Sequence, residues 1–456
     1  MTVPRWIPAR RVRIALWISA ALGMAVWMAL RPHQPGLVAR KAPPTKAGRT
    51  RVKPPAAEVV EFLKTNEPAV SVGRVTYADH IAPILREKCQ ACHRPGQVAP
   101  FSLGTYDQAC RWKRGIREVV LDRRMPPWHA DPRHGTFAND RGLSPAQRAA
   151  IVAWVDQGTP LGDPDAIPEP VAFPDGWTIG TPDAVFTMTR PFTVPAQGVL
   201  SYQRFRVPTN FQGDVWVQAL EARPGDRRVV HHICIYLEGK TPNDEGRAER
   251  PELVCYAPGD LPSVFPKGTA KLIPAGASLV FEVHYTPIGV AKADQSSVGL
   301  IFARDPVRRR AVTKGISNKN LVLPPGAKNH ELRSSFTFPF DARLLSLSPH
   351  LHLRGKDFQY RATYPDGRAE ILLSVPAYDF AWQSVYRLAV PKTMPHGTRI
   401  DCVAHFDNSA DNPNNPDPTA EVRWGDQTWD EMMIGYIDYD VIEPRALAGR
   451  PAPGLR

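Results

Sequence analysis

The arrangement of apolar and polar residues divides the chain into three stretches. An uncharged apolar run covers residues 14–30, helix signals follow between residues 83 and 158, and short alternating segments predominate from Val171 onward. Apolar residues at every second position favour strands, whereas a spacing of three to four residues favours helices. Beyond the apolar run, the pattern predicts a small all-α domain followed by an all-β body.

Two helices can be placed from their end signals. Pro83 opens a short helix that runs into Cys89, since proline is tolerated in a first turn. A later helix begins at Ser144, and Gln147 supplies the reciprocal partner of a capping box. Gly158 ends this helix. Its predicted apolar face consists of Ile151, Val152 and Val155.

The alternating segments indicate β-sandwich architecture because frequent proline and glycine separate them. Clear examples are residues 215–217, 229–237, 279–285 and 358–364. A body of about 275 residues is long for one sandwich. Residues 323–327, Leu-Pro-Pro-Gly-Ala, have the composition of a hinge. We therefore expect two jelly-roll-like sandwiches, 170–328 and 329–446, and a tail at 447–456.

Positive charge is concentrated at the N-terminus. The net charge is +12, yet residues 1–53 hold eleven Lys or Arg and no acidic residue, which leaves the rest of the chain near balance. The body therefore offers no footprint for nucleic acid. Residues 1–31 have the basic flank and apolar run of a signal peptide or an inner-membrane anchor, and residues 32–58 form a Pro-rich basic linker. Either interpretation places the remaining chain outside the cytoplasm, in the periplasm or another extracytoplasmic location.

The sequence Cys89-Gln90-Ala91-Cys92-His93 predicts covalent attachment of a c-type haem. Two thiols three positions apart fit two thioether bonds, and the adjacent histidine is placed to bind iron. A zinc site would need a second ligand pair with suitable spacing. Residues 59–165 are then a cytochrome c-like domain. Its stretch 124–143 resembles haem domains that are fused to exported bacterial oxidoreductases.

The sixth iron ligand is predicted to be Met125, in Arg-Met-Pro-Pro-Trp-His. Proline after the ligand favours an extended loop from which a thioether can reach the haem face. A packing role for Met125, or His129 as the ligand, are the alternatives. The other four cysteines, in an oxidising compartment, can form up to two disulfides, and Cys234 with Cys255 is the first pair to expect.

Histidine groups in the β-rich body indicate metal binding. His350 and His352 alternate, so on a strand both side chains lie on one face. His231 and His232 are adjacent and need a bulge or a strand end to serve one ion. His284 can add a third imidazole, and the Asp-Glu-Met-Met string at 430–433 offers a thioether. Imidazoles together with a thioether favour copper over magnesium or calcium.

The segments HHICIYL, FEVHYTP, SPHLHLRGK and WDEMMIGY, in this order, resemble the type II copper monooxygenases, represented by peptidylglycine alpha-hydroxylating monooxygenase and dopamine beta-monooxygenase. The resemblance implies two eight- or nine-stranded sandwiches that each hold one copper across a cleft. It implies an electron-transferring copper on His231, His232 and His284. It also implies an oxygen-activating copper on His350, His352 and Met432, where Met432 rather than Met433 matches the ligand position. Tyr436 matches a tyrosine of the family's pocket, although a packing role is equally compatible.

Two departures from the family bear on the substrate. Ser348 stands where the peptide-amidating enzyme has an arginine that binds a carboxylate, and Ile434 stands in place of an asparagine. A peptide C-terminus is therefore a poor candidate, and a small, less charged organic molecule is expected.

The resulting expectation is an exported copper monooxygenase that hydroxylates a C–H bond with O₂. A periplasmic electron donor or an ascorbate-like reductant would supply electrons, relayed by the fused haem. The alternative is a membrane-tethered electron carrier whose sandwiches bind copper or a partner without oxygenase activity. Copper storage is a third possibility. No Gly-rich nucleotide loop, nucleophile elbow or His-Glu-x-x-His motif is present in the sequence.

Overall fold

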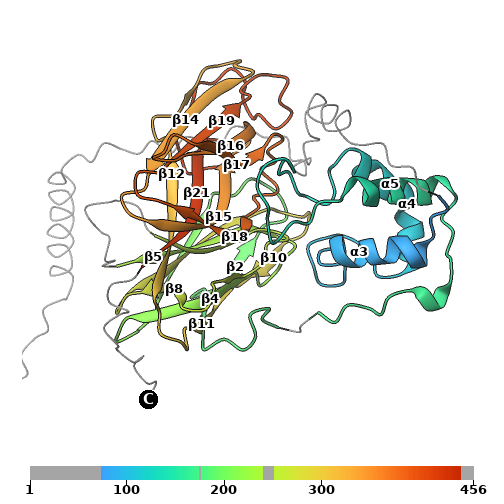
Figure 1. The fold of residues 1–456 in the computed structure, drawn as a ribbon, viewed down its shortest axis with the longest axis horizontal. Helices are drawn as coiled ribbons and strands as arrows, with labels where there is room; N and C mark the ends of the chain where they lie inside the picture. Colours follow the sequence, from blue (N-terminus) through green and yellow to red (C-terminus); the bar gives the residue numbers. More distant parts are fainter. Residues whose placement is uncertain (1–72, 174–175, 240–250, 443–456) are drawn as a thin grey trace, which may run out of the picture. The chain divides into compact units, whose positions relative to one another are not determined.

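The computed structural model describes residues 73–173, 176–239 and 251–442, and β-strands predominate over helices in them (Figure 1). The expected targeting segment at 1–31, the linker at 32–58 and the tail at 447–456 lie outside the described residues. Within the described part of the chain, no helix is both long and apolar enough to cross a membrane. The predicted mainly β architecture with a small helical part is confirmed at this level.

The helical part contains α3 (Ala82–Lys88), α4 (Tyr106–Leu121) and α5 (Pro145–Asp156), with short turns η1 (Tyr77–Ile81) and η2 (Pro164–Ala166). The predicted capping box of Ser144 and Gln147 at the start of α5 is confirmed. The expected apolar face of α5 is only partly right. Ile151 and Trp154 are fully buried, whereas Val152 and Val155 are half-buried, because the helix turns its large tryptophan toward the core.

Twenty-one strands make up the rest of the described chain. The first eleven are β1 (Ala184–Thr187), β2 (Phe192–Val194), β3 (Gln203–Pro208), β4 (Val215–Arg223), β5 (Val230–Glu238), β6 (Glu252–Tyr256), β7 (Ser263–Val264), β8 (Thr269–Ile273), β9 (Ser278–Tyr285), β10 (Lys292–Asp294) and β11 (Ser297–Phe302). The others are β12 (Arg309–Ser317), β13 (Val322–Leu323), β14 (His330–Thr337), β15 (Ala342–Leu351), β16 (Gly355–Thr363), β17 (Ala369–Val375), β18 (Tyr386–Met394), β19 (Arg399–Phe406), β20 (Val422–Arg423) and β21 (Met433–Ile442).

Two hydrophobic cores lie against one long sheet. Its order is β1-β11-β4-β8-β12-β21-β15-β18, with β7 beside β4. The first core is formed between the first half of this sheet and the four-stranded sheet β3-β9-β5-β6. The second is formed between the other half and the sheet β14-β19-β16-β17. Strand β12 contributes Ala311 to the first core and Ile316 to the second, so the long sheet passes continuously through both sandwiches.

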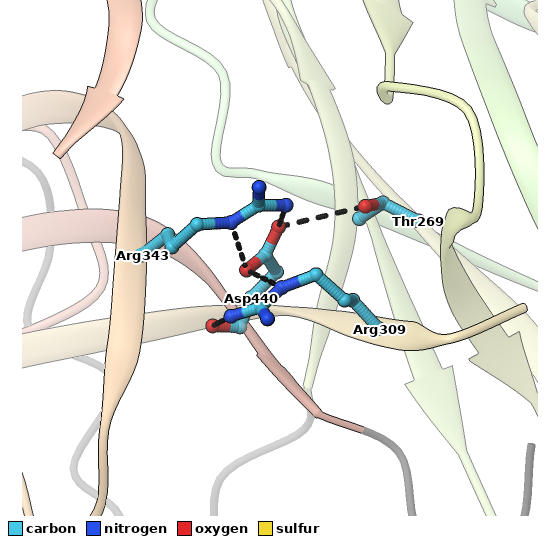
Figure 2. A network of polar contacts seen from close by, with 4 residues as sticks. All are labelled: Thr269, Arg309, Arg343 and Asp440. Atoms are coloured by element: carbon cyan, nitrogen blue, oxygen red, sulfur yellow. Dashed lines mark hydrogen bonds and ion pairs between the residues drawn. The ribbon is translucent and has the colours of Figure 1, made fainter. Parts of the chain in front are cut away.

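A buried carboxylate holds the middle of the long sheet together (Figure 2). Asp440 on β21 is fully buried, and its carboxylate accepts hydrogen bonds from Arg343 Nη2 at 2.6 Å and Arg309 Nε at 2.5 Å. Thr269 Oγ1 on β8 donates to the same carboxylate at 3.5 Å. Strands β8 and β12 pair in parallel here, so this cluster fixes the two sandwiches to each other where their strands meet.

The segment between α4 and α5 leaves the helical part and packs on the second sandwich. Phe137 forms a β-bridge with Leu388, and Ala138 N donates to Arg387 O at 2.8 Å. The Trp128 ring lies 4.7 Å from the Tyr386 ring, measured between centroids. We call residues 128–141 the strap, because they attach the helical part to the second core.

Candidate metal centres

The haem motif sits on one helical turn at the end of α3. His93 N and Cys92 N both donate to Cys89 O, at 2.9 and 3.1 Å, so the two thiols and the imidazole share that turn. Both thiols are free. His93 Nδ1 lies 3.2 Å from Phe101 O. Because a carbonyl oxygen only accepts, Nδ1 carries the proton and donates, and Nε2 is left available to iron. The residues therefore fit a covalently attached haem with a proximal histidine.

Met125 lies four residues after the end of α4 and precedes the strap. Its backbone N–H donates to Val119 O at 3.2 Å. Its role as the sixth iron ligand stays a prediction. Nearby, burial together with Arg141 lowers the pKa of His129 to about 4, so this imidazole is neutral at ordinary pH.

The first histidine group joins β5 and β9. Val230 pairs with Tyr285 and His232 pairs with His284, so His231 is an extra residue in the ladder. The requirement for a bulge at the adjacent histidines is thus confirmed, since the bulge lets both rings lie on one side. A ligand atom from each of the three histidines lies within 4.8 Å of the other two.

The Nδ1 atoms of this group lack ordinary hydrogen-bond partners. His231 Nδ1 and His232 Nδ1 are 3.1 Å apart, a pair that must share either a proton or a metal ion. His284 Nδ1 is buried and has no hydrogen-bond partner among the described residues. Burial lowers the pKa of His231 to about 4, which favours the neutral imidazole that a metal requires. The group therefore fits a three-histidine metal site.

The second histidine group lies at the end of β15. His350 and His352 point to the same side, with ring centroids 5.2 Å apart, as their alternation predicts. Gln383 Oε1 lies 2.6 Å from His350 Nδ1, and Asp430 O lies 3.3 Å from His352 Nδ1. Both rings therefore keep Nε2 free, and His352 Nε2 is buried with no partner in the described chain. These two Nε2 atoms fit a second metal site.

Glu431 fixes the backbone around the second group. Its fully buried carboxylate accepts hydrogen bonds from His352 N, from Arg354 N at 3.0 Å and from Met432 N at 3.0 Å. Burial raises the pKa of Glu431 to about 7. Met432 faces the cavity described below, whereas Met433 is fully buried in the second core. Of the two methionines, only Met432 lies beside the histidines' cavity.

A cavity of about 610 Å³ lies between the two sandwiches. Both histidine groups contribute to its wall, His232 from the first and His350 and His352 from the second. The two positions that depart from the family, Ser348 and Ile434, line it as well. Tyr436 also lines the cavity, and its ring centroid is 6.2 Å from that of His350. The volume suits a small organic molecule.

Phe380 connects the two histidine groups. Its ring centroid lies 5.3 Å from that of His231, with the planes nearly parallel, and 6.0 Å from that of His284. The ring centroid of His352, from the second group, is 5.9 Å from that of Phe380. Sequence reasoning missed both Phe380 and Gln383, because neither residue type signals metal chemistry and both lie in a loop.

The strap ties this loop to the haem motif. Arg141 donates to Gly259 O at 2.5 Å and to Ser384 Oγ at 2.6 Å, and Asn139 Nδ2 donates to Val385 O at 2.7 Å. Gly259 has a φ of +86°, and a Cβ there would lie 3.6 Å from Cys92 Sγ. The haem motif, the strap, the first sandwich and the loop 380–385 therefore meet at one junction.

The disulfide between Cys234 and Cys255 is present, which confirms the predicted pair. It joins β5 to β6 two residues beyond His232. Because β5 carries two of the three candidate ligands, this cross-link restrains the strand that positions them. Cys110 and Cys402 are free thiols.

Neither a family model nor a curated protein matches the sequence. Among solved structures, the major capsid protein P2 of bacteriophage PM2 is similar with 10% identity and a TM-score of 0.22, over 57% of this chain and 99% of that one. A putative secreted protein from Eubacterium rectale gives 12% identity and a TM-score of 0.17, over 53% of this chain and 70% of that one. The structure of infectious bursal disease virus Gt strain gives 10% identity and a TM-score of 0.17, over 60% of this chain and 75% of that one. Scores this low support no conclusion about fold family or function.

Proposed function

We propose that the chain is an exported copper-dependent monooxygenase that hydroxylates a C–H bond of a small organic substrate. In this proposal a cytochrome c-like domain at 59–165 precedes two jelly-roll-like copper-binding sandwiches. The reaction consumes O₂, two electrons and two protons, and yields one hydroxyl group and one water. The proposed substrate is less charged than a peptide carboxylate, because Ser348, which lines the cavity, stands at the position where the peptide-amidating enzyme of the resembled family has its carboxylate-binding arginine.

The observation that carries the proposal is the pairing of two donor sets around one cavity. Three imidazoles converge from β5 and β9, and two more stand beside Met432. Each set includes a buried ring nitrogen without a partner, at His284 and at His352. A buried polar atom costs stability unless something binds it, so each orphan nitrogen favours a ligand such as a metal ion.

Each donor set has its own task in the proposal. His231, His232 and His284 hold the electron-transferring copper, and His350, His352 and Met432 hold the copper that meets O₂ and substrate. When bound, the two ions supply one-electron steps and oxygen activation. Gln383 keeps His350 in the tautomer with Nε2 free, Glu431 positions Met432, and Tyr436 lies against the His350 ring to shape the substrate pocket.

The proposed task of the haem is to relay electrons. A haem bound to Cys89, Cys92 and His93, with Met125 as sixth ligand, would pass electrons toward the metal sites across the junction of Arg141, Gly259 and Ser384. The electrons come from a periplasmic donor or an ascorbate-like reductant. The proposal also includes export of the body, with the N-terminal segment cleaved or kept as a membrane tether.

Copper-loaded, haem-containing protein tests this function in an oxygen electrode. We expect ascorbate-driven O₂ consumption to rise when a neutral small-molecule substrate is added from a panel. Met432→Leu should abolish this rise, while the matched control Met433→Leu, in the core, should keep it. A haem that cycles between its redox states without any substrate-dependent O₂ consumption would favour the electron-carrier alternative.

A further inference from the structure

The cavity between the sandwiches has a second end, away from the histidines. One of its walls consists of the neighbouring strands β12, β21 and β15, whose alternate side chains face it. In the register of these strands, His350 lies beside Ile434, and Ser346 lies beside Asp438. Asp438 follows Ile434 by four positions on β21, so the two ends of this wall are about 13 Å apart.

The opposite wall runs in the same order. His232, Cys234 and Tyr236 alternate on β5, and all three line the cavity. Tyr236 is the register partner of Glu252 on β6, which lines the cavity as well. This wall therefore leads from a candidate metal ligand, past the disulfide, to a tyrosine and a glutamate.

Lys271 joins the polar ends of the two walls. Its Nζ donates to the carbonyl oxygen of Leu253, the neighbour of Glu252, at 2.6 Å and to Thr313 Oγ1 at 2.7 Å. Thr313 is the register partner of Asp438 and donates a hydrogen bond to its carboxylate. The Lys271 ammonium group lies 3.8 Å from that carboxylate. We call the following residues the distal end of the cavity: Tyr236, Glu252, Lys271, Thr313 and Asp438.

Two polar groups of the distal end lack partners. The Tyr236 hydroxyl and the Glu252 carboxyl group form no hydrogen bond or ion pair with the residues that the structure describes, and both side chains are half-buried in the cavity wall. Opposite residues of an antiparallel pair have Cβ atoms about 5 Å apart, so one ligand group can reach both. Polar groups that lose contact with bulk water are nearly always hydrogen-bonded, so this pair favours a polar ligand.

The charges of the distal end favour a neutral ligand. Asp438 has a counter-charge in Lys271 and accepts a further hydrogen bond from Ser346 Oγ at 2.7 Å. Burial raises the pKa of Glu252 to about 7, although Lys271 acts in the opposite direction. About half of the Glu252 side chains therefore carry a proton at neutral pH and can donate as well as accept. A cation would be repelled by Lys271, whereas a hydroxyl group can bond to both Glu252 and Tyr236.

We propose that the distal end binds a hydroxyl group of the substrate, which is an elongated neutral alcohol. The hydroxyl group lies between Tyr236 and Glu252, and the C–H bond that reacts lies at the other end of the cavity, beside His350 and Met432. The reaction at that end rests on the proposed monooxygenase function. One oxygen atom of O₂ enters the C–H bond, and the other leaves as water with two electrons from the reductant and two protons. The product is a diol whose hydroxyl groups are far apart.

Binding without turnover tests the distal end. The full chain with its haem and copper is titrated with n-octanol under nitrogen, and binding is measured by calorimetry. Octyl methyl ether, which cannot donate a hydrogen bond, and octylammonium, which carries a charge, are the comparison ligands. We expect n-octanol to bind at least about tenfold more tightly than either, because a site that hydrogen-bonds a hydroxyl group rejects an analogue without it.

Two substitutions should remove this preference. Tyr236→Phe and Glu252→Ala should each weaken n-octanol binding about tenfold and leave binding of octyl methyl ether within about twofold of native. Damage to the fold would instead weaken binding of both ligands. Glu252→Gln, which can still donate and accept, should restore n-octanol binding. Glu421→Ala, at a surface pair with Arg423, should change neither affinity.

Several results would overturn the proposal. They are no binding of n-octanol, equal affinity for n-octanol and its methyl ether, tighter binding of octylammonium, or n-octanol affinities that neither substitution changes. The monooxygenase function fails separately. If n-octanol binding depends on Tyr236 and Glu252 but ascorbate-driven O₂ consumption does not rise with any substrate, the hydroxyl-binding site is supported and the reaction is wrong. If O₂ consumption rises with other substrates while n-octanol does not bind, only this inference is wrong.

Discussion

Gln383 Oε1 accepts a hydrogen bond from His350 Nδ1 over 2.6 Å, and the amide is oriented by Gln383 Nε2, which donates to Phe380 O. The next residue, Ser384, accepts a hydrogen bond from Arg141 of the strap. One loop therefore bonds the strap through Ser384 and a candidate metal ligand through Gln383. Through Phe380 the same loop also contacts His231, His284 and His352.

Replacing Gln383 by leucine should weaken the second metal site and spare the first. The leucine leaves His350 Nδ1 without an acceptor, so its tautomer and ring orientation are no longer fixed. Loss of such a partner typically costs about 10–100-fold in metal affinity. Chelator competition with Cu(II) should show one of two sites weakened by that factor. Gln383→Glu, which keeps an acceptor oxygen, should bind nearly normally.

The control for this prediction is Gln212→Leu. Gln212 is exposed, and its amide donates to Asn210 O away from either histidine group. Equal weakening of both sites in Gln383→Leu, or no weakening at all, would show that this hydrogen bond does not position a ligand.

Replacing Cys89 and Cys92 together by serine should separate the haem from the metal sites. Thioether bonds cannot form, so covalent haem is lost. We expect turnover with a protein electron donor to disappear, while turnover with ascorbate persists. Haem content is measured by the absorbance of the denatured protein, and folding by circular dichroism. Loss of both activities in a folded, copper-replete variant would contradict a relay role for the haem.

Asp440→Asn should destabilise the protein by about 1.5–3 kcal/mol, because it weakens the charge-assisted hydrogen bonds from two partly exposed arginines to a fully buried carboxylate. Urea unfolding measures this loss of free energy. Asp366→Asn is the matched control, since Asp366 and its partner Arg368 are both at least half exposed, and its stability should stay close to native. A native-like midpoint for Asp440→Asn would show that the cluster in Figure 2 does not hold the sandwiches together.

Asp260 should give the stability a measurable pH dependence. Burial raises its pKa to about 6, although Arg141 and Arg387 act in the opposite direction. Between the ordinary pKa of 3.8 and about 6, the folded state holds a proton that the unfolded chain has released. The free energy of unfolding therefore falls as pH rises through this window.

The Asp260→Asn variant removes this effect. The free energy of unfolding of the variant, minus that of native protein, should rise by up to about 3 kcal/mol between pH 4 and pH 7, since one pKa unit is worth about 1.4 kcal/mol. Urea unfolding at each pH measures the difference. Asp305→Asn, at a surface pair with Lys267, serves as the control. A constant difference between the Asp260 variant and native protein across this range would rule out the raised pKa.

Local signals in the sequence predicted much of the fold. The capping box at Ser144, the alternating strands and the Cys234–Cys255 pair depend on neighbours along the chain or on two strands that follow each other in sequence, so the sequence pattern carries them. The bulge at His231 could also be anticipated, because two adjacent side chains cannot share one face of a regular strand.

The features that the sequence did not predict depend on contacts between residues that are far apart in the chain. The strap bonds residues about 246 positions away, as from Asn139 to Val385, and no periodicity encodes such a pairing. The parallel pairing of β8 with β12, which makes one sheet of two expected sandwiches, arises in the same way. Phe380 and Gln383 belong to the candidate site only because folding brings their loop against the histidines.

The most direct measurement of the central claim is oxygen incorporation in cells. Cells that express native protein, Met432→Leu or Met433→Leu at equal haem and copper content are grown under ¹⁸O₂, and their metabolites are compared by mass spectrometry. The account predicts a compound carrying one ¹⁸O atom in cells with native protein or Met433→Leu, and its absence with Met432→Leu. The same labelled metabolites in all three strains would contradict it.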